Sequence, residues 1–313
     1  MAFMKVALIG LGKMGEALAY RAVQAGHTVI GFDVNESMCA AAQAIGVEIV
    51  ESIADFAHHD IHIFWLMVPQ GDLVDKVIAQ LHPLLQSGDT VVDGGNSKYT
   101  DSMRRAQELK KSEINFLDCG TSGGVRGREN GFCLMVGGEK KAYDSIESLL
   151  HSIASPGGYA YVGPSGAGHY VKMVHNGIEY ALLQAYAEGF HLLKEGEFKD
   201  AHLDLEKIAQ LWQSGSIIRS FILELVHDIM QEDQDFAHIS GKVASTGMGQ
   251  WTVEAAHKSD VPVFVIEESL RVRDWSQETG GNYGTKIVAL LRNKFGGHAV
   301  ANAINLGEYN KTY

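Results

Sequence analysis

The sequence predicts an α/β protein in which a doubly wound parallel sheet is followed by an all-helical C-terminal domain. In the first half, short apolar runs alternate with helical patterns, and in the second half only helical patterns remain. Uninterrupted apolar strands that alternate with helices are typical of a parallel sheet whose two faces are both covered. These observations define the expected fold class.

We expect strands in the apolar, β-rich runs and helices where apolar residues recur with helical spacing. The expected strands are 5–10, 28–33, 61–68, 90–93, 115–118 and 132–136, with helices among them at 14–25 and 73–85. The second half predicts helices over 169–195, 204–230, 249–258, 261–278 and 284–295. Glycine-rich segments around 155–168 separate the two patterns, which places the domains at 1–165 and 166–313.

Composition and charge limit the classes of function. The chain has 46% hydrophobic and 20% charged residues, the profile of a folded globular protein. Its formal net charge of −12 argues against a nucleic-acid partner, because nucleic-acid binding needs a basic surface. The same charge means that an anionic substrate has to be met by cations placed locally in its site.

The sequence shows no pattern for membrane insertion, disulfide bonding or metal ligation. No apolar run approaches the roughly 20 residues that span a bilayer, and we expect no signal peptide. The three cysteines are widely spaced and form neither a disulfide framework nor a metal motif. We therefore expect a cytoplasmic protein that binds no metal, no membrane and no nucleic acid.

A G-x-G-x-x-G segment directly follows the first strand and opens the first helix. In that context the glycines allow a tight turn, a close backbone approach to a pyrophosphate and close helix packing. The helix N-terminus adds N–H groups and a partial positive charge. This predicts a Rossmann-type dinucleotide site made by Gly10, Leu11, Gly12, Lys13, Met14 and Gly15.

Asp33 ends the second strand, where a carboxylate can accept hydrogen bonds from both ribose hydroxyls of an adenosine. Val34 and Asn35 follow it, without an arginine. A 2′-phosphate would meet a negative charge and no cationic partner there. The sequence therefore predicts NAD in preference to NADP.

Five polar residues recur with helical spacing in the first long helix of the second half. Measured from the first of them, they lie at +3, +4, +7 and +8, within one stripe of a helix. An apolar core would not hold five unpaired polar side chains, so the stripe lines a polar cleft or, alternatively, is a solvated charged face. The residues are Lys172, His175, Asn176, Glu179 and Tyr180.

A lysine and a glutamate in one cleft suit paired acid–base chemistry. A partly desolvated lysine can give up its proton and serve as a base, and a glutamate can hold a proton and serve as an acid. We expect Lys172 and Glu179 to take these two roles.

Together with four further motifs, these features make the chain resemble the 6-phosphogluconate dehydrogenases, in their short bacterial form, over nearly its whole length. The further motifs follow in order along the chain: 93–97 (DGGNS), 121–125 (TSGGV), 249–252 (GQWT) and 292–298 (RNKFGGH).

The resemblance implies a role for each matching residue. Lys172 is then the general base and Glu179 the general acid, while Asn176 and His175 hold the sugar hydroxyls. The other implied contacts are Ser122, Gly123 and Gly124 with the substrate carboxylate, Asn96 with substrate and nicotinamide ribose, Val68 with the cofactor, and Tyr180, Arg273 and Arg292, with His298 nearby, with the phosphate.

The same resemblance implies the reaction and the assembly. A phosphorylated sugar acid, 6-phosphogluconate, would be oxidised and decarboxylated to ribulose 5-phosphate and CO₂, with reduction of NAD and without a metal, as in the pentose phosphate pathway. The family's C-terminal arginine and histidine normally reach into a neighbouring subunit's site. Arg292 and His298 therefore imply a homodimer or homotetramer.

Gln250 departs from the family pattern, which commonly has a lysine or arginine just before the Trp-Thr pair. Glutamine can donate a hydrogen bond but brings no charge. Loss of a charge-assisted bond costs about 1.5–3 kcal/mol. We keep Gln250 among the substrate-binding residues and expect weaker binding of the substrate or a slightly different one.

Two other functions compete with this prediction. A related β-hydroxyacid dehydrogenase, acting on a substrate such as 3-hydroxyisobutyrate without decarboxylation, would share the glycine loop, the Ser-Gly-Gly turn and the lysine. It would lack the phosphate cations and the acid at Glu179. A non-catalytic NAD-binding protein would need the loop but not the lysine–glutamate stripe.

Overall fold

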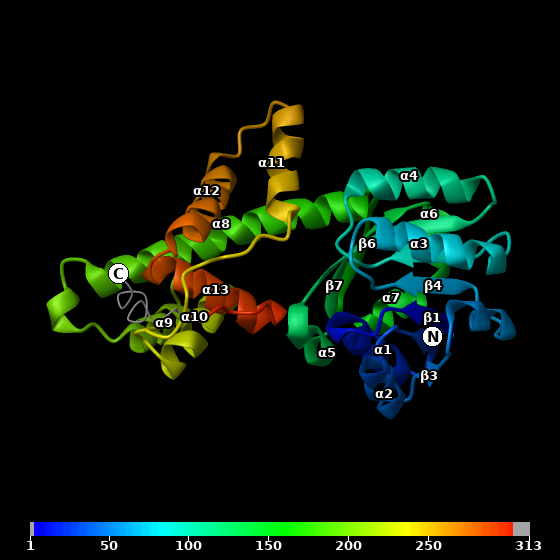
Figure 1. Ribbon diagram of the computed structural model, residues 1–313, viewed down its shortest axis with the longest axis horizontal. Helices are drawn as coiled ribbons and strands as arrows, with labels where there is room; N and C mark the ends of the chain where they lie inside the picture. Colours follow the sequence, from blue (N-terminus) through cyan, green and yellow to red (C-terminus); the bar gives the residue numbers. More distant parts are fainter. Residues whose placement is uncertain (1–2, 303–313) are drawn as a thin grey trace, which may run out of the picture. The chain divides into compact units, whose positions relative to one another are not determined.

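The computed structural model describes residues 3–302, and the chain divides into two compact units, Met1–Met173 and Val174–Tyr313 (Figure 1). The division falls inside the long helix α8 (Ala167–Glu195), whereas the boundary expected from the sequence lies at residue 165. The first turns of α8 belong to the first unit because they pack against its sheet.

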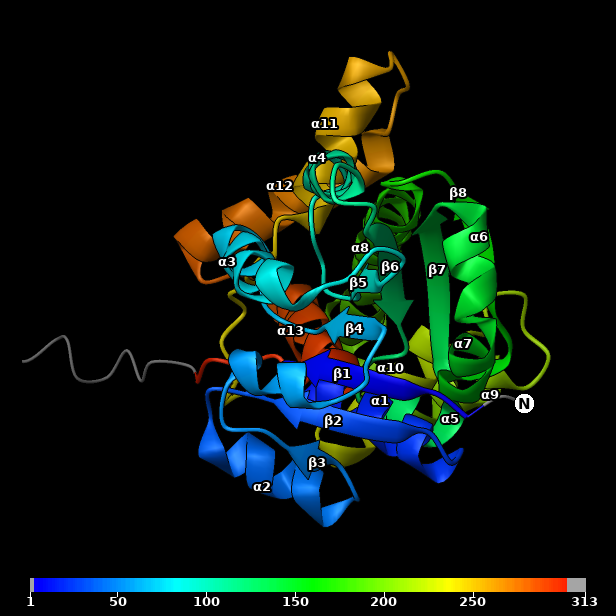
Figure 2. The same cartoon turned by 90° about the vertical axis from the view of Figure 1, so that its right-hand side faces the viewer.

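The first unit is built on an eight-stranded sheet in the order β3-β2-β1-β4-β5-β6-β7-β8 (Figure 2). Neighbouring strands are parallel except β6 and β7, which are antiparallel. The expectation of a parallel sheet is confirmed for the first six strands and is wrong for β7. The strands are β1 Lys5–Ile9, β2 Thr28–Phe32, β3 Glu48–Ile49, β4 Ile63–Leu66, β5 Thr90–Asp93, β6 Asn115–Ser122, β7 Phe132–Gly138 and β8 Ala154–Gly163.

Helices cover both faces of this sheet, as expected for a doubly wound fold. One apolar core contains Leu8 and Leu18 together with Leu149, and the other contains Ile9, Val77 and Leu109. The alternation of side chains along each strand sends neighbouring residues into opposite cores. The helices of the first unit are α1 Lys13–Gln24, α2 Glu36–Ala44, α3 Asp72–Leu81, α4 Tyr99–Lys110, α5 Gly127–Asn130, α6 Lys140–Ser145 and α7 Glu147–Ile153, with 3-10 turns at Ile53–His58, His82–Leu84 and Gly124–Arg126.

The strand order reverses between β1 and β4, because β2 and β3 lie to one side of β1 while β4, β5 and β6 lie to the other. In open α/β sheets, ligands bind beyond the carboxyl ends of the strands at such a switch point. The glycine-rich segment follows β1, and Val68 follows β4. The fold therefore places the expected cofactor residues at the edge where a dinucleotide binds.

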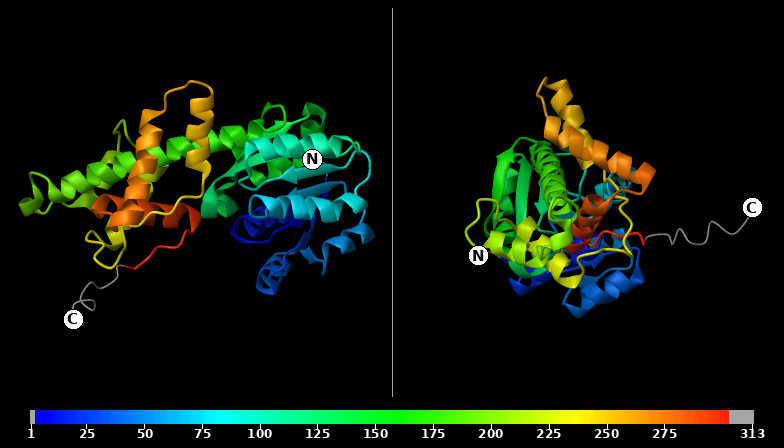
Figure 3. Two further views of the ribbon diagram at one scale, coloured as in Figure 1. Left: turned by 45° about the horizontal axis from the view of Figure 1, so that its top comes forward. Right: turned by 90° about the vertical axis from the view of Figure 1, so that its left-hand side faces the viewer.

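The second unit is helical (Figure 3). Its core joins α8, α9, α10 and α13 through side chains such as Phe190, Leu223 and Ile287. The stretch 204–230, expected to be helical throughout, forms two helices because the chain turns at Gly215, which has a φ of +89°. The helices after α8 are α9 Leu205–Gln213, α10 Phe221–Glu232, α11 Met248–Lys258, α12 Phe264–Thr279 and α13 Tyr283–Gly296, with a 3-10 turn at Lys199–Ala201.

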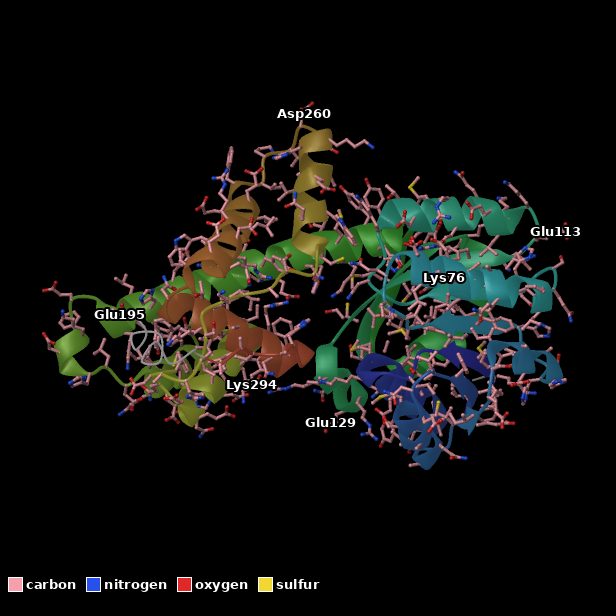
Figure 4. The ribbon with its side chains drawn as sticks, viewed as in Figure 1. Lys76, Glu113, Glu129, Glu195, Asp260 and Lys294 are labelled. Atoms are coloured by element: carbon pink, nitrogen blue, oxygen red, sulfur yellow. The ribbon has the colours of Figure 1, made fainter. Side chains whose placement is uncertain are left out.

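Helices α11 and α12 lie side by side in the second unit and are joined by a tight turn. Asp260, labelled in Figure 4, lies in that turn with a φ of +54°. The same view labels Glu195 at the end of α8 and Lys294 in the last turn of α13, where it forms an ion pair with Glu232 of α10. These helices carry all the expected functional residues from His175 to Arg292.

Candidate active site

The glycine-rich turn has the geometry of a dinucleotide loop. A Cβ on Gly10, whose φ is +95°, would lie 2.6 Å from the Met67 carbonyl oxygen, and a Cβ on Gly15 would lie 2.0 Å from the Gly10 carbonyl oxygen. A Cβ on Gly12 would meet no atom within 4 Å. The first and third glycines are thus required by packing, while the second faces open space at the start of α1, where a pyrophosphate has room to approach.

Asp33 lies directly after β2 and is tied to the glycine-rich turn. Its Oδ2 accepts a hydrogen bond from the Leu11 N–H at 2.6 Å, and its Oδ1 accepts one from the Asn35 N–H at 2.8 Å. The side chain is partly exposed. The carboxylate is therefore fixed beside the loop, in the place where it would meet the adenosine ribose.

A buried ion pair holds the segment that carries Asn96. Asp93 accepts hydrogen bonds from Ser97 Oγ at 2.7 Å and from the Gly95 N–H at 3.2 Å, and its Oδ2 lies 3.4 Å from Arg105 Nη1. Asp93, Ser97 and Arg105 are at most 1% exposed, whereas Asn96 is exposed. The turn therefore directs Asn96 outward on a rigid base.

Arg105 was not anticipated from the sequence. It comes from α4, a helix that was not expected, and its partners lie in separate segments of the chain. The side chain also donates to both carboxylate oxygens of Asp75 and to the Gly71 carbonyl. The one sequence feature that could have indicated a buried Arg105 is its position on the apolar face of an amphipathic helix.

The Ser-Gly-Gly turn begins at the end of β6. Ser122 pairs with Cys133 across the antiparallel β6–β7 ladder, and Gly123 and Gly124 have φ values of +137° and +54°. Only glycine adopts two such successive conformations at low cost. Successive N–H groups in a turn of this kind make a concave anion-binding surface, which suits a carboxylate.

Lys172 is buried, with 6% of its surface exposed, and it packs against β6. A Cβ on Gly120 would lie 2.4 Å from the Lys172 Cβ, so the lysine occupies the space that any other residue at position 120 would fill. The expected stripe starts at this lysine, and α8 is one continuous helix through Glu195. The sequence spacing therefore does correspond to one helical stripe.

The next residues of the stripe belong to the second unit. His175 Nδ1 lies 3.0 Å from Asn176 Oδ1, and Asn176 is 9% exposed. A Cβ on the following Gly177 would lie 2.8 Å from the Thr252 Cγ2, which shows how closely α11 approaches α8 here. This packing fixes the helical face that carries His175, Asn176 and Glu179.

Tyr180 is the centre of a buried cationic cluster. The Arg273 guanidinium carbon lies 3.3 Å from the centroid of the Tyr180 ring, and Arg273, Arg292 and Tyr180 are 2%, 6% and 4% exposed. Arg273 Nη1 and Nη2 find no hydrogen-bond partner within residues 3–302. Buried guanidinium N–H groups without partners are costly, and an anion would satisfy them.

The pKa values in this cluster reflect burial and charge. Burial lowers the pKa of the Arg273 guanidinium to about 10, with Tyr180 opposing that shift and Arg292 adding to it. Burial also lowers the pKa of Arg292, against the effects of Tyr180 and Glu179. Burial would raise the pKa of the Tyr180 phenol, but Arg273 and hydrogen bonds to Thr246 and Ser245 hold it below the usual value.

Arg292 lies in this cluster through its own chain. In this structure the charges of Tyr180 and Glu179 of the same polypeptide raise its pKa, against the effect of burial, and its expected reach into a neighbouring subunit's site stays a prediction. His298 is partly exposed just beyond α13, where its carbonyl accepts a hydrogen bond from Asn293 Nδ2 at 2.8 Å.

Two hydroxyl residues in the cluster were missed. Thr246 Oγ1 lies 3.2 Å from the Tyr180 hydroxyl, and Ser245 also interacts with that phenol. Gln250, the residue singled out from the sequence, is exposed on α11. The comparison with the family motif concerned only the position just before the Trp-Thr pair. It did not indicate Ser245 or Thr246, because both residues precede α11 and contact Tyr180 from the loop before that helix.

Within the part of the chain that the structure describes, no group of three or more His, Cys, Asp or Glu residues is arranged to hold a metal ion. A search of the same residues for a helix long and apolar enough to cross a membrane found none.

A dinucleotide loop at a sheet switch point, with a buried lysine and a cationic cluster elsewhere in the chain, defines the class as a dinucleotide-dependent oxidoreductase. Two family models match consecutive parts of the chain: the NAD binding domain of 6-phosphogluconate dehydrogenase over residues 5–163, and the 6-phosphogluconate dehydrogenase C-terminal domain over residues 168–298. The chain belongs to the 6-phosphogluconate dehydrogenase family.

Individual relatives agree with this assignment. The chain is 44% identical over 302 residues to the NAD(+)-dependent, decarboxylating 6-phosphogluconate dehydrogenase of Haloferax volcanii, covering 95% of this chain and 99% of that protein. The solved 6-phosphogluconate dehydrogenase of Plasmodium falciparum has a TM-score of 0.79 at 28% identity, covering 87% of this chain and 62% of that one. The 3-hydroxyisobutyrate dehydrogenase of Mycobacterium tuberculosis, with a TM-score of 0.71 at 20% identity over 93% of this chain and 100% of that one, shares the fold.

Proposed function

We propose that this protein catalyses the oxidative decarboxylation of 6-phosphogluconate to ribulose 5-phosphate and CO₂ with NAD, the reaction of the pentose phosphate pathway. The observation that carries the proposal is the buried pair Arg273 and Arg292 around Tyr180, in which the Arg273 Nη groups find no hydrogen-bond partner among the described residues 3–302. A non-phosphorylated hydroxyacid would leave the Arg273 Nη groups without a hydrogen-bond acceptor. A phosphate dianion would satisfy it with charge-assisted, bidentate bonds.

In the proposed reaction, Lys172 starts as the base. It takes the proton of the C3 hydroxyl while the C3 hydride leaves. NAD, when bound, supplies the hydride acceptor. The product of this step is a 3-keto acid, and the Lys172 ammonium then donates a hydrogen bond to the new carbonyl oxygen. The electron pair of the C1–C2 bond moves onto this carbonyl as the C1 carboxylate departs as CO₂, and the Lys172 ammonium stabilises the enolate oxygen that results.

Glu179 completes the proposed reaction as the acid. It protonates the carbon that lost CO₂, and tautomerisation of the enediol gives ribulose 5-phosphate. Its carboxyl group lies near enough to Arg273 and Arg292 to affect the pKa values of both. We assign Asn176 and His175 to the sugar hydroxyls, and Ser122, Gly123 and Gly124 to the substrate carboxylate through backbone N–H groups.

We propose NAD rather than NADP as the preferred cofactor. The Asp33 carboxylate is fixed beside the loop by two backbone N–H groups, and the residues after it, Val34 and Asn35, are exposed and uncharged. A 2′-phosphate at that point would be repelled by Asp33. Gly10–Gly15, Val68 and Asn96 complete the proposed cofactor contacts.

We also propose a homodimer or homotetramer, although Arg292 does not require one. The support is the row of large apolar side chains that α8 exposes, among them Ile178, Leu182 and Leu192 at 51%, 45% and 72%. Contiguous exposed apolar surface marks interaction sites. The expected cytoplasmic location stays a prediction. Cys39, Cys119 and Cys133 are free thiols, which agrees with a reducing compartment.

The deciding experiment uses purified protein with 6-phosphogluconate and either NAD or NADP, following both reduced cofactor and released CO₂. We expect equal amounts of the two products and a higher kcat/KM with NAD. Lys172→Met should lower kcat by about 10²–10⁴-fold while NAD still binds. Absence of CO₂ from a wild-type protein that reduces NAD would refute the decarboxylating reaction.

The second candidate is the non-decarboxylating oxidation of a small β-hydroxyacid, which the shared fold allows. It is tested in the same assay with 3-hydroxyisobutyrate in place of the sugar acid. Preference for that substrate, with no effect of Arg273→Met, would favour it over the first proposal.

A further inference from the structure

The N-terminus of α8 is held by a buried carboxylate from the sheet. Asp118 in β6 is fully buried, and its Oδ1 and Oδ2 accept hydrogen bonds from the Gly166 and His169 N–H groups at 2.7 and 2.8 Å. The first N–H groups of a helix have no partners within the helix and carry a partial positive charge. Asp118 therefore caps α8 from a neighbouring strand, and both ends of each bond lie in the first unit.

Glycines allow the helix to approach the sheet this closely. A Cβ on Gly168 would lie 2.2 Å from the Asp118 carbonyl oxygen and 2.5 Å from that of Met135, and a Cβ on Gly137 would lie 2.6 Å from the Gly168 nitrogen. These are backbone atoms, which cannot move aside cheaply. His169 adds a further attachment, because its buried Nδ1 lies 2.7 Å from Ser102 Oγ of α4. The start of α8 thus has one position on the sheet.

The same strand also determines where Lys172 lies. Side chains alternate along a strand, so Asp118, Gly120 and Ser122 share one face of β6. Asp118 holds the helix end, the missing side chain of Gly120 leaves room for the Lys172 Cβ, and Ser122 starts the proposed carboxylate-binding turn. Cys119, between them, points into the core on the opposite face.

We propose that Asp118 and Gly120 are positioning residues for Lys172: the Asp118 carboxylate fixes α8 along its axis, and Gly120 sets the distance between α8 and β6. The inference rests on the proposed function, in which Lys172 is the base. It goes further by assigning the accuracy of the proton transfer to two residues that touch neither substrate nor cofactor. A misplacement of about 1 Å at a reacting group can cost on the order of 10²-fold in rate.

The test compares two variants with two controls in the full-length protein. Asp118→Asn keeps the side-chain volume but turns an NH₂ group toward one backbone N–H, and Gly120→Ala pushes on the Lys172 Cβ while leaving the cap intact. Cys119→Ala weakens the same strand on its other face. Gly189→Ala adds a Cβ on α8 where no atom lies within 4 Å.

The kinetic readouts are kcat per folded molecule, the primary isotope effect with 6-phosphogluconate deuterated at C3, and the Kd for NAD. We expect Asp118→Asn and Gly120→Ala to lose about 10–100-fold in kcat, to show a larger isotope effect and to keep the Kd for NAD within twofold. The two controls should retain the wild-type isotope effect. If the isotope effect and kcat per folded molecule of both test variants equal those of Cys119→Ala, the two residues are merely structural and the proposal is wrong.

A second readout does not depend on turnover. Reductive methylation followed by mass spectrometry reports how fast Lys172 reacts, and this buried lysine should be protected in the wild type. Both test variants should label it faster, while the controls should not. Unchanged labelling in both variants would overturn the positioning role even if activity fell. A wild type that labels as expected but does not turn over 6-phosphogluconate would instead refute the proposed function.

Discussion

Each of the two units has an arginine that is at most 2% exposed, and these two arginines differ in their surroundings. Arg105 in the first unit is 1% exposed and donates to Asp75, Asp93, Ser97 and the Gly71 carbonyl. Arg273 in the second unit is 2% exposed, stacks on Tyr180, and has no hydrogen-bond partner for Nη1 and Nη2 within residues 3–302.

This difference separates a structural arginine from a ligand-binding one. Burial of a guanidinium costs free energy unless its N–H groups are satisfied. Arg105 is satisfied by the protein itself, so the bonds serve the fold and hold the segment of Asn96. The Nη groups of Arg273 have no such partner within residues 3–302. Its burial therefore costs free energy, and an anion that binds there would recover that cost. The predictions that follow test this contrast in order of expected size.

The largest effect is expected for Arg105→Met. This change leaves Asp93 buried without its counter-charge, and breaking a buried pair by removing one partner costs about 3–5 kcal/mol. The free energy of unfolding, measured by denaturant titration, should fall by that amount. The neighbouring Arg104→Met is the matched control, because Arg104 is 45% exposed and pairs with the same Asp75; it should cost about 0–1 kcal/mol. Equal losses in both variants would contradict the structural role of Arg105.

Arg273→Met is expected to have the opposite profile. It removes a buried guanidinium whose Nη1 and Nη2 have no hydrogen-bond partner within residues 3–302. We expect the relieved desolvation cost to offset the lost interaction with Tyr180, so the free energy of unfolding should not decrease. The KM for 6-phosphogluconate should rise about 100-fold, equivalent to roughly 2.7 kcal/mol, while the KM for NAD stays constant. Arg271→Met on the exposed side of the same helix is the control and should change neither quantity. A destabilised Arg273→Met protein with an unchanged KM would reverse our interpretation.

Inorganic phosphate should stabilise the protein through the same cluster. At a concentration ten times its Kd, a ligand that binds only the folded state adds about 1.4 kcal/mol to the free energy of unfolding. Thermal melts in increasing phosphate, at constant ionic strength, should show this gain in the wild type and in Arg271→Met but not in Arg273→Met. A gain that survives Arg273→Met would mean that phosphate binds elsewhere.

The smallest effect is a pH dependence of substrate affinity. The pKa of Tyr180 is held below its usual value by Arg273 and by the two hydroxyls, so the phenol becomes a phenolate as the pH rises toward about 10. A phenolate repels the substrate phosphate, and Arg273, with its pKa lowered to about 10, loses charge in the same range. The KM for 6-phosphogluconate should therefore increase several-fold at alkaline pH. Tyr180→Phe should flatten the increase; an equally steep profile in that variant would exclude the phenol as its cause.

The fold was predictable where one local pattern determines one element. The glycine-rich turn and the strands before and after it follow from short-range sequence signals, and the structure has them at the expected places. The reversal of β7 was not predictable, because a short apolar run gives no indication of its direction. Strand β8 was missed since Pro156 and two glycines make it look like a loop, and such residues are tolerated in the exposed strand at the sheet edge.

The candidate site shows the same division. Helical spacing predicted one helix through Lys172 and Glu179, and both lie on the continuous helix α8; their pairing as base and acid stays a prediction. No local pattern singles out Thr246 or Asp118, because their contacts join segments 66 and about 50 residues apart and depend on tertiary packing. The comparison with the family pattern pointed to Gln250, because a cation is missing there. In the structure Gln250 is exposed, and Thr246 is the residue that contacts the Tyr180 phenol.

The antiparallel pairing of β6 with β7 has a consequence for how this protein could acquire new substrates. Because Ser122 and Cys133 are partners in the ladder, the connection 123–131, which contains a 3-10 turn and the short helix α5, has both of its ends fixed by the sheet. Residues can be added or exchanged inside such a connection while the register below it persists. Laboratory evolution aimed at a different acid group would therefore do best to diversify the non-glycine positions of this connection and to leave the strands and the glycines untouched.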